Sequence, residues 1–204
     1  MTGLLRLFLK KSKQKLEIAR KLFRRFVFFY LPNIGNNYRS RFSFKIMPAF
    51  NQRTIFTGVG KIEIGINCVL GFKRGGFHHG GSIEIQSRTK NSLIKIGDYV
   101  ATNNNIFFCA ANLIVVGDHT LIGQNVTFMD FEAHGTMPDQ RRNIGKIGKI
   151  MIGKNVWIGN NVTILKNTEI GDNSIVATGA VVMGKFPSNV IIGGVPAKII
   201  KVLS

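Results

Sequence analysis

Acidic residues and cysteines are both scarce in this chain of 204 residues. Only 10 Asp and Glu stand against 28 Lys and Arg, which gives a formal net charge of +18. Cys68 and Cys109 are too few for a disulfide framework and lack metal-ligand spacing, so we expect buried small side chains in a reducing compartment. The positive charge favours an anionic partner: nucleic acid, a phosphate-bearing cofactor or a membrane surface.

Long hydrophobic runs are also missing. The longest one near the N-terminus, residues 26–31, is far shorter than the roughly 20 residues of a membrane-spanning helix, and lysines interrupt any signal-peptide core. We therefore expect a cytoplasmic protein. Hydrophobic residues still make up 45% of the chain, which argues against global disorder and suits one folded domain with a short appendage.

Residues 1–35 are predicted to form a basic amphipathic helix. Between residues 4 and 30, apolar side chains recur at helical spacing, while nine Lys and Arg and the single acid Glu17 occupy the rest of the helix. Such helices bind anionic bilayers, so residues 4–30 could attach the protein peripherally to the inner face of the membrane. Packing on the protein itself or on a neighbouring subunit is the alternative.

A six-residue repeat dominates the sequence from about residue 58. Each hexad is expected to supply one short strand and one corner of a prism, with its leading aliphatic residue pointing inward. A following asparagine suits a left-handed corner, and a small or β-branched residue suits the narrow interior. The aliphatic positions are Ile152, Ile158, Ile164, Ile170, Val176 and Val182. The asparagines are Asn67, Asn125, Asn155, Asn161, Asn167 and Asn173. The small positions are Cys68, Val126, Val156, Val162, Thr168, Ser174 and Ala180.

These hexads resemble those of the hexapeptide-repeat acyltransferases. The resemblance implies an all-β fold, a left-handed parallel β-helix, over residues 36–201. The stretch from Asp130 to Lys201 is most similar to the maltose, galactoside and polysaccharide O-acetyltransferases, because it combines a His-bearing loop, Arg141-Arg142 and the ending Val195-Pro-Ala-Lys198.

That group implies an acetyl-CoA-dependent enzyme that acetylates a hydroxyl of a sugar, in the synthesis of a cell-surface polysaccharide or a lipid-linked glycan. It also implies a homotrimer with active sites between neighbouring subunits. Two other functions stay open on this fold. One is an N-acyltransferase that acts on an amino-sugar nucleotide, and the other is a non-catalytic β-helix that serves as an assembly platform.

The period breaks after Phe128, and the ejected loop 131–146 carries the expected catalytic residue, His134. A neutral imidazole can remove a proton from a sugar hydroxyl while that oxygen attacks a thioester carbonyl. The resemblance implies this same role, without a covalent enzyme intermediate. Asp130 or Glu132, both assigned to the acceptor side, could orient the second ring nitrogen, and a backbone carbonyl would serve equally well.

Further site residues follow from the resemblance. Asn103 is expected to hydrogen-bond the acceptor sugar, although three successive asparagines could also be corner residues only. Coenzyme A needs a long groove with cations nearby. The residues expected to border its pantetheine arm are Trp157, Asn160 and Thr178, and those expected to meet its phosphates are Lys185, Lys198 and Lys201.

The remaining histidines do not suggest a metal site. His119 takes the corner place of a hexad and is expected at the surface, and His78 and His79 fall in a glycine-rich loop that we expect to be flexible. Their spacing does not favour three zinc ligands, so we expect no metal. A nucleic-acid partner is not expected either, because no helix-turn-helix, zinc-finger or RNP motif is present.

Overall fold

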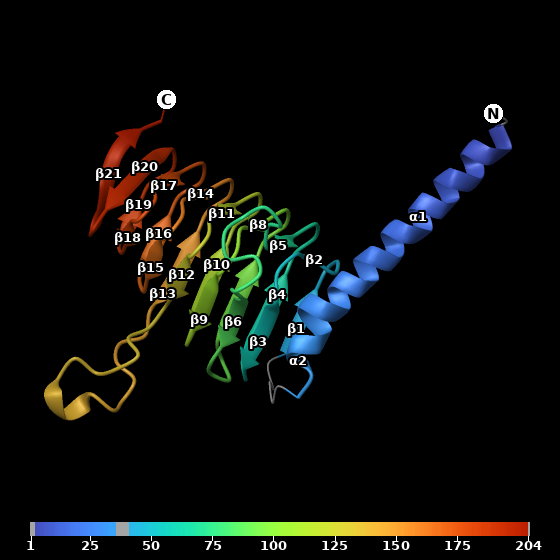
Figure 1. The fold of residues 1–204 in the computed structure, drawn as a ribbon. Helices are drawn as coiled ribbons and strands as arrows, with labels where there is room; N and C mark the ends of the chain where they lie inside the picture. The colour runs from blue at the N-terminus through green and yellow to red at the C-terminus, as the bar shows by residue number, and fades with distance from the viewer. Residues whose placement is uncertain (1–2, 36–40, 204) are drawn as a thin grey trace.

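The computed structural model describes residues 3–35 and 41–203, and within them the hexads form the predicted left-handed parallel β-helix (Figure 1). Strands of successive coils stack into three sheets, here called A, B and C. Sheet A contains β1 (Arg41–Phe44), β4 (Lys61–Ile64), β7 (Leu93–Ile96), β10 (Leu113–Val116), β13 (Lys149–Ile152), β16 (Thr168–Ile170) and β19 (Lys185–Phe186). Sheet B contains β2 (Ala49–Phe50), β5 (Val69–Leu70), β8 (Ala101–Thr102), β11 (Leu121–Ile122), β14 (Trp157–Ile158), β17 (Ile175–Val176), β20 (Val190–Gly194) and β21 (Ala197–Val202). Sheet C contains β3 (Thr54–Gly58), β6 (Ile83–Ser87), β9 (Phe107–Ala110), β12 (Thr127–Met129), β15 (Thr163–Leu165) and β18 (Val181–Val182).

The interior of the prism is filled as the repeat predicts. All six leading aliphatic residues from Ile152 to Val182 are buried, and so are the small residues one place after each corner. Cys68 and Cys109 are buried free thiols, as expected, and burial raises the pKa of Cys109 to about 11. Because every coil contributes the same inward positions, the core is one continuous column of hydrophobic side chains, mostly aliphatic with some phenylalanines.

The corners adopt the predicted left-handed backbone. The six asparagines singled out from the sequence have φ between 53° and 62°, a region that asparagine tolerates better than most residues. Their amides also connect coils: Asn105 Nδ2 donates to Asn125 Oδ1 at 2.6 Å, and Asn125 Nδ2 donates to Asn161 Oδ1 at 3.0 Å. His119 takes such a corner with φ 60° and is exposed, as expected.

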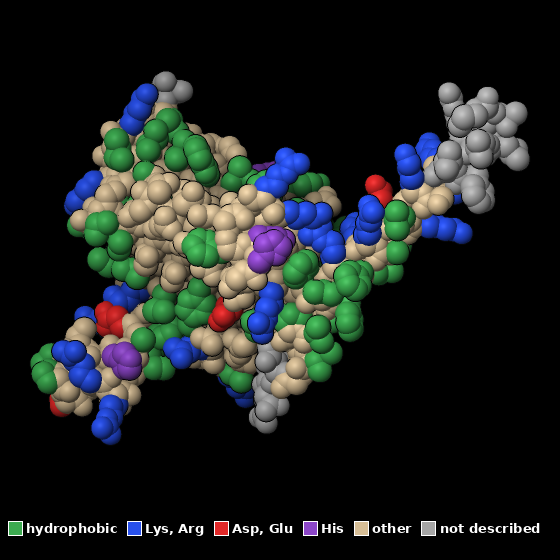
Figure 2. Space-filling view, viewed as in Figure 1, with side chains coloured by type: hydrophobic (Ala, Val, Ile, Leu, Met, Phe, Trp, Pro, Cys, Tyr) green, Lys and Arg blue, Asp and Glu red, His purple; other side chains and the backbone are tan. Residues whose placement is uncertain are grey.

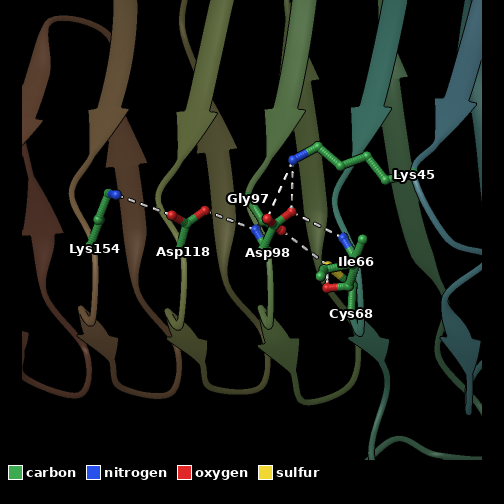
Figure 3. A network of polar contacts seen from close by, with 7 residues as sticks. All are labelled: Lys45, Ile66, Cys68, Gly97, Asp98, Asp118 and Lys154. Atoms are coloured by element: carbon green, nitrogen blue, oxygen red, sulfur yellow. Dashed lines mark hydrogen bonds and ion pairs between the residues drawn. The ribbon is translucent and has the colours of Figure 1, made fainter.

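A second ladder of polar contacts crosses the coils where sheet A turns into sheet B (Figure 3). The Asp98 carboxylate accepts the Ile66 N–H at 3.0 Å and lies 3.2 Å from Lys45 Nζ. The Asp98 N–H in turn donates to Asp118 at 2.9 Å, and Asp118 pairs with Lys154 at 3.2 Å. The pKa values of both carboxyls are held below the usual range, mainly by hydrogen bonds from backbone N–H groups and next by the lysines.

The N-terminal end of the prism is closed by a helical segment. It consists of α1 (Gly3–Arg25), the π-helical turn η1 (Phe26–Tyr30) and α2 (Leu31–Asn33). Phe29 is 2% exposed and stacks on Phe50 with ring centroids 4.5 Å apart. Most of α1 projects away from the prism (Figure 1). None of the helices in the part of the chain that the structure describes is long and apolar enough to cross a bilayer.

Buried Asn33 fixes this closure. Its Nδ2 donates to the carbonyls of Phe29 at 2.6 Å and Thr54 at 2.8 Å, and its Oδ1 accepts the Phe56 N–H at 2.9 Å. One amide side chain therefore connects the turn η1 to strand β3.

Replacing Phe29 by Ala should lower the free energy of unfolding by about 3–5 kcal/mol, the usual cost of removing a buried phenyl ring. Urea unfolding at a fixed protein concentration measures this. The matched control is Phe23→Ala on the exposed face of α1, where 68% of the residue is accessible and the change should stay within about 0.5 kcal/mol. Equal stability of the two variants would contradict the closure described above.

Candidate functional site

The outer face of sheet B carries a row of apolar side chains that ends in a lysine. Neighbouring strands place these residues directly opposite one another, about 5 Å apart. Trp157 and Leu121 are 56% and 52% exposed, so the row offers apolar surface to solvent. In order from β8 to β21, the row consists of Ala101, Leu121, Trp157, Ile175, Ile191 and Lys201.

Beside this row lies a groove of about 300 Å³ that brings three of the expected site residues together. Asn103, assigned to the acceptor, lines it with Trp157 and Asn160, which are assigned to the donor. The apolar part of the lining includes Leu121 and Phe72. The groove therefore combines apolar walls with amide groups, as binding sites for a long organic cosubstrate commonly do.

Glycines allow the coils to approach closely along the groove. The Asn160 Oδ1 accepts the N–H of Gln124 at 2.9 Å. A Cβ atom on Gly123 would lie 2.6 Å from that oxygen, and a Cβ on Gly159 would lie 2.7 Å from the backbone nitrogen of Thr178. Glycine at the second place of these hexads thus leaves room for two residues of the following coils, Asn160 and the exposed Thr178.

The loop of residues 72–82 borders the groove and is more firmly held than the sequence suggested. Buried Asn104 donates to the carbonyls of Phe72 and Gly76 at 2.8 and 2.9 Å and accepts the Phe72 N–H at 2.9 Å. Gln52, also buried, donates to the Phe77 carbonyl at 2.7 Å. These bonds fix the glycine-rich segment that carries His78 and His79.

His134 lies exposed on the ejected loop, with one ring nitrogen held by the backbone. Its Nδ1 is 2.7 Å from the carbonyl oxygen of Arg141. A carbonyl oxygen only accepts hydrogen bonds, so in the neutral imidazole Nδ1 carries the proton and the lone pair is on Nε2. Of the partners left open by the sequence, a backbone carbonyl orients the ring, and neither carboxylate does.

Asp130, assigned to the acceptor side, lies inside the base of the ejected loop. Asp130 is fully buried, and its carboxylate accepts three backbone N–H groups, from Ala111 at 2.7 Å, Asn112 at 2.9 Å and Leu113 at 2.6 Å. Burial raises the pKa of this carboxyl, against the opposing effect of those three donors. Asp130 therefore holds the base of the ejected loop and offers no surface to a substrate.

Glu132 is engaged at the same base. Its Oε1 pairs with Lys166 Nζ at 3.2 Å, and its Oε2 accepts the Lys146 N–H at 3.0 Å. These contacts hold the pKa of the Glu132 carboxyl below its usual range, and the hydrogen bond from the Lys146 backbone has the largest effect. Its role toward the acceptor stays a prediction.

The three expected phosphate-binding lysines lie on two different sheets. Lys198 and Lys201 lie on β21, at the end of the sheet that carries Trp157. Lys185 lies on β19 of sheet A, where its Nζ pairs with Glu169 at 3.2 Å. A single chain thus aligns two of the lysines with the apolar row but not Lys185.

A single chain also leaves His134 apart from the groove. The loop leaves the prism between β12 of sheet C and β13 of sheet A, closes through an antiparallel bridge of Phe131 with Ile147, and projects away from the body (Figure 1). Its tip contains the short 3-10 helix η2 (Pro138–Gln140). The groove lies on sheet B.

Sequence reasoning missed four contributors to this region. Leu121 could have been found, because it holds the same hexad place as Trp157. Phe72 and the loop-holding role of Asn104 became visible only when the coils were stacked. The Arg141 carbonyl has no sequence signal, since any residue supplies one.

Comparisons with known proteins agree with the fold. The family model described as bacterial transferase hexapeptide (six repeats) matches residues 149–184. A galactoside O-acetyltransferase of Escherichia coli strain K12 is 36% identical over 112 residues, which cover 54% of this chain and 54% of that protein. A sophorolipid acetyltransferase of Starmerella bombicola is 41% identical over 109 residues, which cover 53% of this chain and 42% of that protein.

A solved structure of an acetyltransferase is also similar to this chain. A galactoside acetyltransferase in complex with coenzyme A superposes with a TM-score of 0.52 at 35% identity, covering 54% of this chain and 56% of the other. The chain thus spans about half the length of the curated relatives it matches. With its stacked hexads, the repeat region of this chain is similar to these acetyltransferases, and residues 149–184 match the hexapeptide transferase model.

Proposed function

We propose that the protein is an acetyl-CoA-dependent O-acetyltransferase that acts on a hydroxyl group of a sugar. The observation that carries this proposal is the geometry of His134, whose Nδ1 is held by the Arg141 carbonyl at 2.7 Å so that Nε2 can accept a proton. The relatives named above support it, because both are acetyltransferases and a solved galactoside acetyltransferase is in complex with coenzyme A.

The apolar row on sheet B is the proposed path of the pantetheine arm. Trp157 would pack against the arm, while Asn160 and exposed Thr178 would supply polar contacts at its edge. Lys201 ends the row and Lys198 lies on the same strand, so the phosphates of the donor would lie there and its thioester would point toward Asn103. Lys185 would contact the donor phosphates only from another copy of the chain.

The proposed reaction is a direct transfer. His134 Nε2 takes the proton of the acceptor hydroxyl while that oxygen bonds to the thioester carbonyl carbon. The resulting tetrahedral intermediate collapses as its carbon–sulfur bond breaks, and the imidazolium returns its proton to the sulfur. The products are the O-acetyl sugar and coenzyme A, and the enzyme forms no covalent intermediate.

A homotrimer would complete the site. In one chain the His134 loop leaves from the corner between sheets C and A, whereas the groove with Asn103 and Trp157 lies on sheet B. A loop that projects from one subunit can reach the groove of the next, and cyclic symmetry repeats this contact three times. We therefore propose that each active site takes its base from one subunit and its groove from the neighbour.

The proposed acceptor belongs to a cell-surface polysaccharide or a lipid-linked glycan. Asn103 offers an amide to the groove; its Oδ1 accepts the N–H of Asn104 at 2.9 Å, which leaves the NH2 group to donate to a sugar hydroxyl.

His134→Ala should lower the turnover number by about 10²–10⁴-fold, the usual contribution of a positioned general base. Release of free thiol from acetyl-CoA, in the presence of sugars, amino sugars and extracted envelope glycans, measures it. The control is His119→Ala, because that exposed histidine stacks on Tyr99 at a corner and should leave the rate unchanged. Thiol release that occurs only with free amines, or equal rates in both variants, would contradict the proposal.

Trp157→Ala should raise the KM for acetyl-CoA by about 10–100-fold with little change in turnover number, because burying an aromatic face against a ligand is worth roughly 1.5–3 kcal/mol. Steady-state kinetics at saturating acceptor measure both constants. Tyr99→Ala removes a comparably exposed ring at a corner outside the groove and should change neither. An unchanged KM in the Trp157 variant would contradict the proposal that the donor binds along sheet B.

Mixed trimers test the shared site. Subunits with His134→Ala and subunits with Asn103→Ala plus Trp157→Ala should each be nearly inactive alone. Co-expressed in equal amounts, they should recover about a quarter of the wild-type activity, because random mixed trimers each contain one site with an intact loop and an intact groove. No recovery in verified mixed trimers would mean that base and groove come from the same chain.

A further inference from the structure

Helix α1 and the turn η1 expose an apolar stripe that the β-helix does not cover. Leu16, Phe23, Phe26 and Tyr30 follow one another at spacings of seven, three and four residues, which places them on one helical face. They are between 50% and 68% exposed. An exposed stripe of large apolar and aromatic side chains indicates a surface that binds something.

The rest of the described helix is strongly basic. Residues 10–25 contain eight Lys and Arg side chains and one acid, Glu17. Lys10 and Lys21 lie on the face opposite the apolar stripe by helical spacing. Lys13, Arg20 and Arg24 flank the stripe along one side. A basic face beside a row of phenylalanines is complementary to an anionic surface with an apolar interior.

The stripe continues onto the end of the prism. Leu31 and Ile34 follow it at 52% and 69% exposure, and Phe42 and Ile46 are exposed on the first coil. Figure 2 shows hydrophobic side chains along one side of the helix and onto the body, with Lys and Arg on other sides. The apolar surface is therefore a single area, which we call the N-terminal apolar surface, formed by Leu16, Leu22, Phe23, Phe26, Tyr30, Leu31 and Ile34.

The surface is rigidly joined to the prism. The buried Phe29 ring is stacked on Phe50, and the Arg25 guanidinium donates to the Met47 carbonyl at 3.3 Å. The turn η1 thus fixes the direction in which α1 leaves the body. Whatever binds the helix would hold the whole β-helix in one orientation.

We infer that the N-terminal apolar surface and the basic faces of α1 bind an anionic phospholipid bilayer, with the helix lying in the headgroup region. The phenylalanines enter the boundary with the acyl chains, and the lysines and arginines contact lipid phosphates. A helix bundle with further copies of this chain is disfavoured by charge, because it would gather eight like charges from each subunit. Nucleic acid would leave the phenylalanines exposed. The inference does not depend on the proposed acetyl transfer.

Co-sedimentation of the full chain with vesicles tests this inference. Binding is expected on vesicles of phosphatidylglycerol and phosphatidylcholine, and much weaker binding on phosphatidylcholine alone or at high salt. Phe23→Ser with Phe26→Ser should abolish binding. Lys13→Gln, Arg20→Gln and Lys21→Gln together should weaken it about a hundredfold, from roughly 1 kcal/mol per basic residue.

The matched control is Ile144→Ser, which removes an equally exposed apolar side chain, at 54%, from the ejected loop; it should bind vesicles like the wild type. Circular dichroism and size-exclusion chromatography establish that each variant keeps its fold and its oligomeric state. Equal binding to neutral and anionic vesicles would overturn the inference. The inference would also be overturned if the phenylalanine variant changed the oligomeric state but still bound vesicles. Binding of the wild-type protein to a DNA duplex, without binding to vesicles, would overturn it as well.

Discussion

The structure depends on the hydrogen-bonded stacking of one coil on the next. Each hexad can pair with the coils before and after it only if its aliphatic residue points inward and its corner adopts a left-handed backbone. Ile158 and Ile164 show the first requirement, and Asn155 and Asn161 show the second. The repeated constraint yields a rigid prism whose outer face presents side chains at fixed positions.

Three segments leave this regular pattern, and one buried polar side chain holds the base of each. Asn33 ties the N-terminal helix to β3, Asn104 holds the loop 72–82, and Asp130 holds the loop that carries His134. Each makes three hydrogen bonds to backbone groups in the structure. Such buried groups stabilise only the arrangement in which all their bonds are made, so the rigid coils determine where each departure points.

The sequence was sufficient for the coils, because a period of six with inward Ile and corner Asn leaves few other folds. It was insufficient for Asp130, which resembles a catalytic carboxylate beside a histidine but is turned inward by the N–H groups of an adjacent coil. The sequence also grouped Lys185 and Lys201 as phosphate-binding residues, whereas the fold places them on different sheets. Strand partners in neighbouring coils lie 16 or more residues apart in the sequence, and local patterns do not reveal these contacts.

In the proposed enzyme, the groove on sheet B binds the donor and a loop from another subunit supplies the base. A crystal structure of the protein with coenzyme A and a glycan acceptor tests this most directly. The account predicts the pantetheine arm along Leu121 and Trp157, with His134 Nε2 of the neighbouring subunit within hydrogen-bond reach of the acceptor hydroxyl. Coenzyme A bound on another sheet, or a His134 ring that faces solvent in the complete assembly, would contradict it.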